Sequence, residues 1–137
     1  MSTRGGVTPD APVWTELAPE RAPSDEERRL LEWLAAAVDE PLLHDHVATA
    51  AVTAVCRCGC PSVRLRSAAA PIPEARVSQL SHGSRPDYFS VSAAGPAGVQ
   101  VVLHVARGRL LELEVFAGEG VAAPVPDVRD LTDVTVS

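Results

Sequence analysis

A chain of 137 residues with 46% hydrophobic and 22% charged residues has the composition of one globular domain, and 4% aromatic residues leaves a core of Val, Leu and Ala. The formal net charge is -6 and the arginines are scattered, which excludes a surface that follows a nucleic-acid backbone. No stretch approaches the length of a membrane span and no leader segment opens the chain, so the sequence predicts a cytoplasmic protein with neither nucleic acid nor membrane as a partner.

Residues 1–23 differ in composition from the rest of the chain. Four prolines stand among Gly, Ser, Thr and charged residues, which predicts a disordered or loosely packed tail. Trp14, with Val13 and Leu17, forms an apolar patch in this segment, and we expect the patch to dock on the domain. Residues 24–137 are predicted to form a single α+β domain.

A helix is predicted to begin at Ser24, because Ser24 and Glu27 have the spacing of a capping box. Apolar residues then recur at helical spacing. The helix is expected to end near residues 39–40, because a proline disfavours helical geometry in the residue before it. That proline, Pro41, suits the first position of a second, shorter helix over residues 42–47.

Alternation of apolar and polar residues predicts the strands, with weaker patterns in the short segments 75–80 and 131–136. The clear strand segments are 50–55, 63–66, 88–93, 99–106 and 110–116. The last three are joined by turns so short that neighbouring strands must run antiparallel. We therefore expect an α+β fold in which one or two N-terminal helices pack on an antiparallel meander of about five strands.

The last clear strand has two distinct sides. Leu111, Leu113 and Val115 alternate with Glu112 and Glu114, so one face of the sheet is predicted to be buried and the other to face water. Glu112 and Glu114 are candidates for binding a protein partner on the wet face. Paired carboxylates act as catalysts across a cleft, and the wet face of a hairpin offers none. The local motifs of serine hydrolases, phosphate-binding loops and zinc proteases are also absent, so no catalytic residue is predicted.

The three cysteines of the chain lie within five residues, at the end of the first clear strand: Cys56, Cys58 and Cys60. Gly59 and Pro61 predict a turn there. A turn can bring the three sulfurs within about 2.3 Å of a single zinc ion, which is the usual length of a zinc–thiolate bond. The cluster is therefore a candidate metal site, with zinc as the cofactor that it suits.

A fourth zinc ligand would come from one of the histidines His44, His46, His82 or His104. His82 is the best placed of them, because it lies in a Gly- and Ser-rich loop. Two other roles for the cysteines stay open. Nearby arginines would favour a reactive thiolate, although the Cys-x-x-Cys spacing of thiol oxidoreductases is absent. Alternatively, one or two of the cysteines fill the small-residue interior of the strand.

Two hypotheses about function follow from these features. The leading one is a non-catalytic module that presents Glu112 and Glu114 to a protein partner. The alternative is zinc binding or thiol redox chemistry at Cys56, Cys58 and Cys60.

Two short segments of the sequence carry a resemblance to known families. Residues 58–63 read Cys-Gly-Cys-Pro-Ser-Val at a strand end, and residues 108–115 close a hairpin that is followed by Pro126 and Asp127. Together they resemble a family of small uncharacterised actinobacterial proteins with a Cys-x-Cys-Gly-Cys-Pro-Ser strand end. The second segment is also similar to the last hairpin of immunity proteins from bacterial toxin systems. The resemblance implies a compact cytosolic binding domain and assigns no catalytic residue to this sequence.

Overall fold

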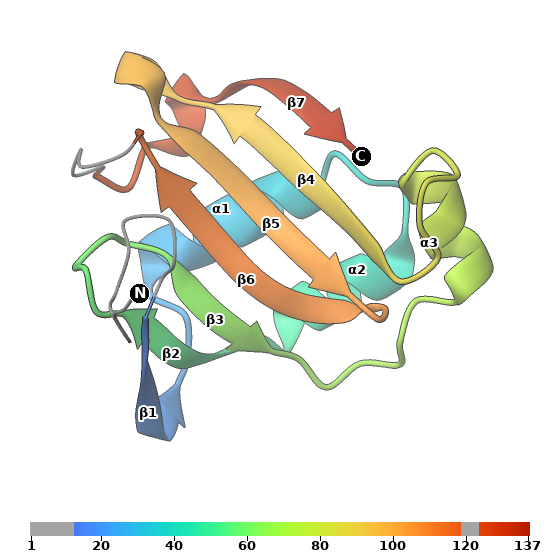
Figure 1. Ribbon diagram of the computed structural model, residues 1–137, viewed down its shortest axis with the longest axis horizontal. Helices are drawn as coiled ribbons and strands as arrows, with labels where there is room; N and C mark the ends of the chain where they lie inside the picture. Colours follow the sequence, from blue (N-terminus) through green and yellow to red (C-terminus); the bar gives the residue numbers. More distant parts are fainter. Residues whose placement is uncertain (1–12, 119–123) are drawn as a thin grey trace, which may run out of the picture.

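The computed structural model describes residues 13–118 and 124–137. Within these ranges the chain forms three α-helices, seven strands and two short 3-10 helices (Figure 1). In chain order the elements are β1 (Trp14–Arg21), α1 (Asp25–Ala35), α2 (Pro41–Ala48), β2 (Ala51–Cys56), β3 (Val63–Arg66), α3 (Glu74–Leu80), β4 (Tyr88–Ala94), η1 (Pro96–Gly98), β5 (Gln100–Ala106), β6 (Arg109–Phe116), η2 (Val128–Asp130) and β7 (Thr132–Val136). No helix in the described ranges is both long and apolar enough to cross a membrane.

The strands form one antiparallel sheet with the order β1-β2-β3-β6-β5-β4-β7. This confirms the α+β fold and the antiparallel pairing, and it agrees roughly with the expected numbers of strands and helices, but the strands do not form a single meander. The sheet consists of two three-stranded meanders, β1-β2-β3 and β4-β5-β6, joined where β3 pairs with β6, and β7 pairs with β4. The chain segment between β3 and β4 contains α3 and leads to a strand that is not a neighbour of β3. The second meander then runs back toward β3, and its last strand, β6, pairs with β3.

The predicted capping box opens α1. The Glu27 amide donates to the Ser24 hydroxyl over 3.2 Å, and the Ser24 amide donates to the Glu27 carboxylate over 2.8 Å. Pro41 occupies the first turn of α2 as expected, and the Glu40 carboxylate caps that helix by accepting from the Leu42 amide. α1 ends a few residues earlier than predicted, because its last turn tightens before Pro41.

Two segments differ from expectation. Glu74–Leu80 forms the helix α3, where alternation predicted a short strand, because Val77 and Leu80 are buried together at helical spacing. Trp14–Arg21 forms β1, where composition predicted a tail as far as residue 23. The Arg21 guanidinium donates two hydrogen bonds to the Glu27 carboxylate, over 2.8 and 3.0 Å, and ties the end of β1 to α1. The remainder of the predicted tail, residues 1–12, lies outside the described residues.

One face of the sheet is covered by helices. In Figure 1, α1 and α2 lie behind the sheet, where α1 contacts β4 and α2 contacts β6. The strands β4 and β5 alternate strictly between buried and half-buried residues, so their apolar side chains form the core beneath these helices. The largest fully buried side chains are Leu30, Leu31, Leu34, Leu43, His46, Val52, Val77, Phe89, Val91, Val101, Leu103 and Leu113.

The alternation is broken in β6. Leu110 pairs with Val105 and Glu112 pairs with His104, so Leu111 is an extra residue that forms a bulge. Leu113 and Val115 are buried as predicted, and Glu112 and Glu114 lie on the opposite face. Leu111 is only half-buried, which corrects the expectation that it would join the core. None of the three α-helices covers this second face, which we call the open face (Figure 1).

Candidate functional site

The three cysteines surround the turn that follows β2. Cys56 is the last residue of the strand, and Gly59 adopts a φ of +88°, which reverses the chain and lets the Gly59 amide donate to the Cys56 carbonyl over 3.2 Å. The sulfurs all lie within 4.8 Å of one another. The Sγ atoms of Cys56 and Cys58 are 2.8 Å apart, and the Cys60 amide donates to Cys58 Sγ over 3.4 Å. All three are free thiols.

The three thiols have different environments. Cys56 is buried, Cys58 is exposed and Cys60 is intermediate. Burial, together with the hydrogen bond to Cys58, raises the pKa of Cys56 to about 12. The pKa of Cys58 is lowered, because the Cys56 and Cys60 thiols and the Cys60 amide all stabilise its thiolate with hydrogen bonds. The first negative charge of the cluster therefore forms on the exposed sulfur, Cys58.

Cys56 does not belong to the main core. The largest cluster of buried apolar residues in the described chain includes Val52 but not Cys56. A register shift in β2 between Val52 and Ala54 explains this, because it turns Ala54 and Cys56 to the opposite side of the sheet. Ala54 pairs with Arg64, which pairs with Glu112 on the open face. Cys56 is nevertheless buried, with 6% of its surface exposed, so the alternative that it fills the interior of the strand stays a prediction.

The structure does not bring any histidine to the cysteines. His82 lies after α3, and its Nε2 atom is 2.7 Å from the Val136 carbonyl of β7. The turn after β2 and helix α3 lie at opposite sides of the molecule (Figure 1). His46 is buried between Ser67 and Ala70. Among the described residues, the only possible metal-ligand group around these sulfurs is the three cysteines themselves.

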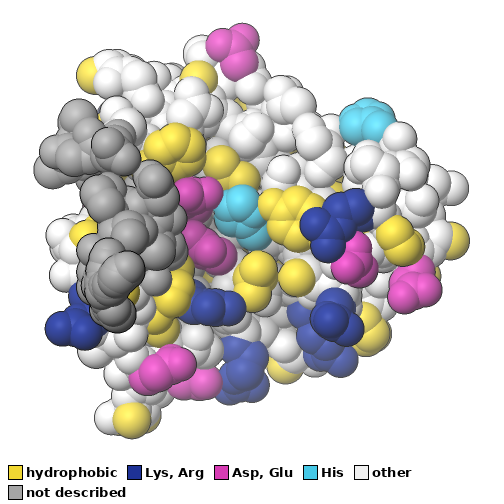
Figure 2. Space-filling model, in the orientation of Figure 1, with side chains coloured by type: hydrophobic (Ala, Val, Ile, Leu, Met, Phe, Trp, Pro, Cys, Tyr) yellow, Lys and Arg dark blue, Asp and Glu magenta, His cyan; other side chains and the backbone are white. Residues whose placement is uncertain are grey.

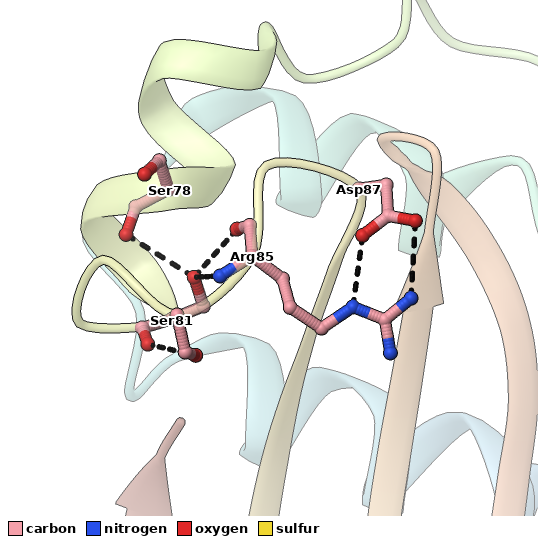
Figure 3. A network of polar contacts seen from close by, with 5 residues as sticks. Ser78, Ser81, Arg85 and Asp87 are labelled. Atoms are coloured by element: carbon pink, nitrogen blue, oxygen red, sulfur yellow. Dashed lines mark hydrogen bonds and ion pairs between the residues drawn. The ribbon is translucent and has the colours of Figure 1, made fainter.

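The loop that carries His82 is held in place by its own hydrogen bonds (Figure 3). The Ser81 hydroxyl donates to the Arg85 carbonyl over 2.6 Å and accepts from the Arg85 amide over 3.1 Å. The Arg85 guanidinium then forms a two-bonded ion pair with Asp87, over 2.9 and 3.0 Å. These contacts fix the conformation of the loop beside α3, which lies on the other side of the molecule from the cysteine cluster.

A second cluster lies at the centre of the open face. The Tyr88 hydroxyl contacts His104 Nδ1, and His104 Nε2 lies 2.8 Å from the Glu114 carboxylate. A carboxylate only accepts, so Nε2 carries the proton and Nδ1 accepts from the tyrosine in the neutral ring. Glu112, opposite His104 in the register, completes the group, and its carboxylate lies within 4.8 Å of the ligand atoms of His104 and Glu114.

Glu112 lacks a close counter-ion. Among the residues that the structure describes, no salt bridge or side-chain hydrogen bond reaches its carboxylate, although His104 and Arg64 stand nearby. Burial and then the neighbouring Glu114 raise the pKa of Glu112, against the opposing effects of His104 and Arg64. The open face therefore holds a half-buried carboxylate whose charge is poorly compensated.

Aromatic and basic side chains surround this cluster. The Arg85 guanidinium lies 5.2 Å from the centre of the Tyr88 ring, and the Arg64 guanidinium lies 5.6 Å from that of Trp14. Trp14 pairs with Cys56 in the sheet, so the cysteine cluster adjoins the same face. Figure 2 shows acidic side chains beside a histidine on this face, with hydrophobic side chains next to them and basic ones around them.

Two hollows on the surface of the described residues lie away from both clusters. One is lined by Glu26, Arg29 and residues 125–129, and another by residues 71–74, 86–87 and 107. Neither includes a cysteine or a member of the His104 cluster.

Glu112 and Glu114 are the residues of the open-face cluster that the sequence analysis identified for partner binding. It missed Tyr88, and it considered His104 only as a ligand for the cysteines. Strand alternation could have indicated that both point to the wet face, since His104 is half-buried between buried neighbours and Tyr88 is half-buried next to the buried Phe89.

Comparisons of the chain with protein-family models, with curated proteins and with solved structures found no match. The resemblance to actinobacterial and immunity proteins therefore stays a prediction.

Proposed function

We propose that the chain is a non-catalytic, cytoplasmic binding module whose open face binds a protein partner through a basic side chain. The observation that carries this proposal is the half-buried Glu112 carboxylate, which lies beside Glu114 without a close counter-ion among the described residues. A lysine or arginine of a partner would supply the missing charge. Immunity to a toxin with a basic surface is one version of this function.

The surroundings of Glu112 support a protein rather than a free cation as the partner. Tyrosine, tryptophan and arginine are the residues that contribute most binding energy at protein interfaces, and Tyr88, Trp14, Arg64 and Arg85 lie around the cluster. Phe116, at the end of β6, is 42% exposed and extends the apolar part of the face. The net charge of -6 would also speed the approach of a basic partner.

Glu112→Gln is expected to weaken partner binding at least about thirtyfold, because it removes one half of a desolvated charge pair. The variant should stay folded, since burial and the neighbouring Glu114, which raise the pKa of Glu112, make its charge unfavourable in the free protein. Glu32→Gln is the matched control: it makes the same change at an exposed position of α1. The measurement is calorimetric titration of a partner captured with the wild-type chain. Equal affinity of both variants would reject the open face as the binding site.

The cysteine cluster supports a second candidate function, soft-metal binding or thiol chemistry. The observation in its favour is that three free thiols gather within 4.8 Å at an accessible turn. Three thiolates and a water can complete the tetrahedral shell of zinc. The exposure of Cys58 and its lowered pKa also favour attack by this sulfur on an electrophile.

In metal-free protein at neutral pH, we expect Cys58 to react with iodoacetamide first and Cys56 last. Stoichiometric zinc should slow the reaction of all three thiols, since coordination occupies the sulfur lone pairs. Labelled peptides analysed by mass spectrometry give the order, and elemental analysis gives the zinc content. Arg57→Ala, at the exposed residue between the first two cysteines, keeps all three thiols and should leave the order of their reactions unchanged. Thiols that resist the reagent and take up no zinc would end this candidate function.

A further inference from the structure

We infer that Cys56, Cys58 and Cys60 form a site that prefers a three-coordinate, thiol-seeking centre, namely trivalent arsenic, to a four-coordinate metal ion. This inference rests on the second candidate function, a ligand site at the cysteine cluster, and it names the class of ligand. It follows from the number of donors, from their spacing and from the charge that the site can hold.

The number of donors is three. His82, the expected fourth ligand, is bound to β7 on the other side of the molecule, and no other His, Asp or Glu of the described residues joins the group. Ser62, the nearest hydroxyl along the chain after the cysteines, is buried and engaged with the backbone of Val115, over 2.9 Å to its amide and 3.3 Å to its carbonyl. A centre that needs only three bonds is thus satisfied by the chain alone.

The sulfurs are also close together. Four thiolates around zinc stand about 3.8 Å apart, which follows from a tetrahedron with 2.3 Å bonds. Here the Sγ atoms of Cys56 and Cys58 are 2.8 Å apart, and all three sulfurs lie within 4.8 Å of one another. A pyramidal centre, whose bonds meet at nearly right angles, holds its three sulfurs closer together than a tetrahedral one. All three come from one turn, so they approach such a centre from one side.

The net charge of the complex with three thiolates distinguishes arsenic from zinc and copper. Three thiolates leave a zinc or copper(I) complex negatively charged, in a chain whose net charge is already -6 and with one sulfur, that of Cys56, buried. Arsenous acid, As(OH)3, is neutral, and its product with three thiols is neutral as well. Each S–H and each As–O bond breaks, each As–S bond forms, and each thiol proton leaves with a hydroxide as water. Three waters are released, and arsenic stays trivalent, so no oxidant or reductant takes part.

The positions of the sulfurs set the order of bond formation. Cys58 is exposed and makes the first bond. Cys60 is half-buried and already linked to Cys58 through its amide, and Cys56 is within 2.8 Å of Cys58 beneath it. Once the first bond has formed, the other two thiols are present at a high effective concentration, so the later bonds cost little entropy.

The test is native mass spectrometry and calorimetric titration of the full chain with sodium arsenite. We expect one arsenic per chain and a mass gain of one arsenic less three hydrogens. Cys58→Ala should retain no three-thiol adduct and lose affinity at least about tenfold, because one bond of the chelate is gone. This change is at an exposed residue and leaves the fold intact, as circular dichroism would verify. Arg57→Ala should bind like the wild type.

A second probe separates this inference from the function on which it rests. Phenylarsine oxide has only two positions for thiols, so it reports a pair of accessible cysteines. Binding of phenylarsine oxide together with an arsenite adduct that keeps a hydroxyl group would overturn the three-coordinate site and leave the thiol site intact. Displacement of arsenite by equimolar zinc would overturn it as well. Failure of iodoacetamide, zinc and both arsenicals to react would remove the thiol site itself.

Discussion

Replacing Gly108 with alanine is expected to lower the free energy of unfolding by about 3–4 kcal/mol. Gly108 turns the chain between β5 and β6 with a φ of +77°. A Cβ atom there would lie 2.5 Å from the Ile72 carbonyl oxygen and 2.6 Å from the Ile72 amide nitrogen. Both are backbone atoms, so no rotamer change relieves the contact. Either the turn opens, or the segment that carries the buried Ile72 leaves the core.

The same turn also provides a hydrogen bond, since the Ile72 amide donates to the Gly108 carbonyl over 3.0 Å. The matched control is Gly98→Ala in the turn between β4 and β5. Gly98 has nearly the same φ, +79°, but nothing lies within 4 Å of a Cβ atom built there. That variant should lose only about 1–2 kcal/mol, the cost of the left-handed conformation. Urea unfolding of the three proteins measures the difference, and equal losses would contradict a close approach at Gly108.

The elements that form through short-range interactions are the ones that the sequence predicts. α1 begins at the capping box of Ser24 and Glu27, and α2 begins at Glu40 and Pro41. The spacing of the capping box predicts the first start, and Pro41 predicts the second. The hairpins of β4, β5 and β6 follow from short turns between alternating segments. In these segments the local conformational preference of the sequence and the tertiary packing favour the same structure.

The missed elements depend on distant partners. β1 contains one proline and mostly exposed residues, so its composition favours a tail, yet it gains hydrogen bonds from β2 and an ion pair between Arg21 and Glu27. The seven residues of α3 fit a strand and a helix about equally well by pattern. Burial of Val77 and Leu80 together decides for the helix, and this depends on packing that local pattern does not contain.

The open-face cluster depends on one irregularity. The turn at Arg107 and Gly108 pairs Ala106 with Arg109, and a regular register from there would place His104 opposite Leu111. The bulge at Leu111 shifts this register and brings Glu112 opposite His104. A similar shift in β2 turns Cys56 toward the open face. The residue types of both sites were therefore visible in the sequence, whereas their neighbours were not, because bulges are set by the whole sheet.

The second large effect on the free energy of unfolding is expected at a buried histidine. His46 is fully buried, its Nε2 donates to the Ala70 carbonyl over 2.8 Å, and its Nδ1 accepts from the Ser67 hydroxyl over 2.7 Å. The Ser67 oxygen accepts in turn from the Leu110 amide over 3.2 Å. This network joins α2 and β6 through the chain after β3. His46→Gln is expected to cost about 2–4 kcal/mol at pH 7, because glutamine cannot satisfy both buried partners.

The same residue makes stability depend on pH. Burial lowers the pKa of His46 from its ordinary value of 6.5, against the Ala70 carbonyl, which raises it. Below pH 6.5, His46 is therefore protonated in the unfolded chain, whereas in the folded protein it stays neutral until the pH falls to its lowered pKa. The contribution of neutral His46 is complete above pH 6.5 and is lost as the pH falls toward the folded pKa, with a slope of at most about 1.4 kcal/mol per pH unit. Unfolding free energies measured between pH 7.5 and 5 should show this loss in the wild type.

Glu112 acts in the opposite direction, because its raised pKa lets the folded protein bind a proton more readily than the unfolded chain as the pH falls toward 5. This effect is common to the wild type and to His46→Gln, so it cancels in the difference between them. The difference should shrink as the pH falls, since the variant has no histidine to protonate at this position. His44→Gln, which removes a histidine from the same helix without its buried network, should keep the full pH dependence. A pH dependence that survives in His46→Gln and disappears in His44→Gln would assign the titration to the surface of α2 instead of its buried side.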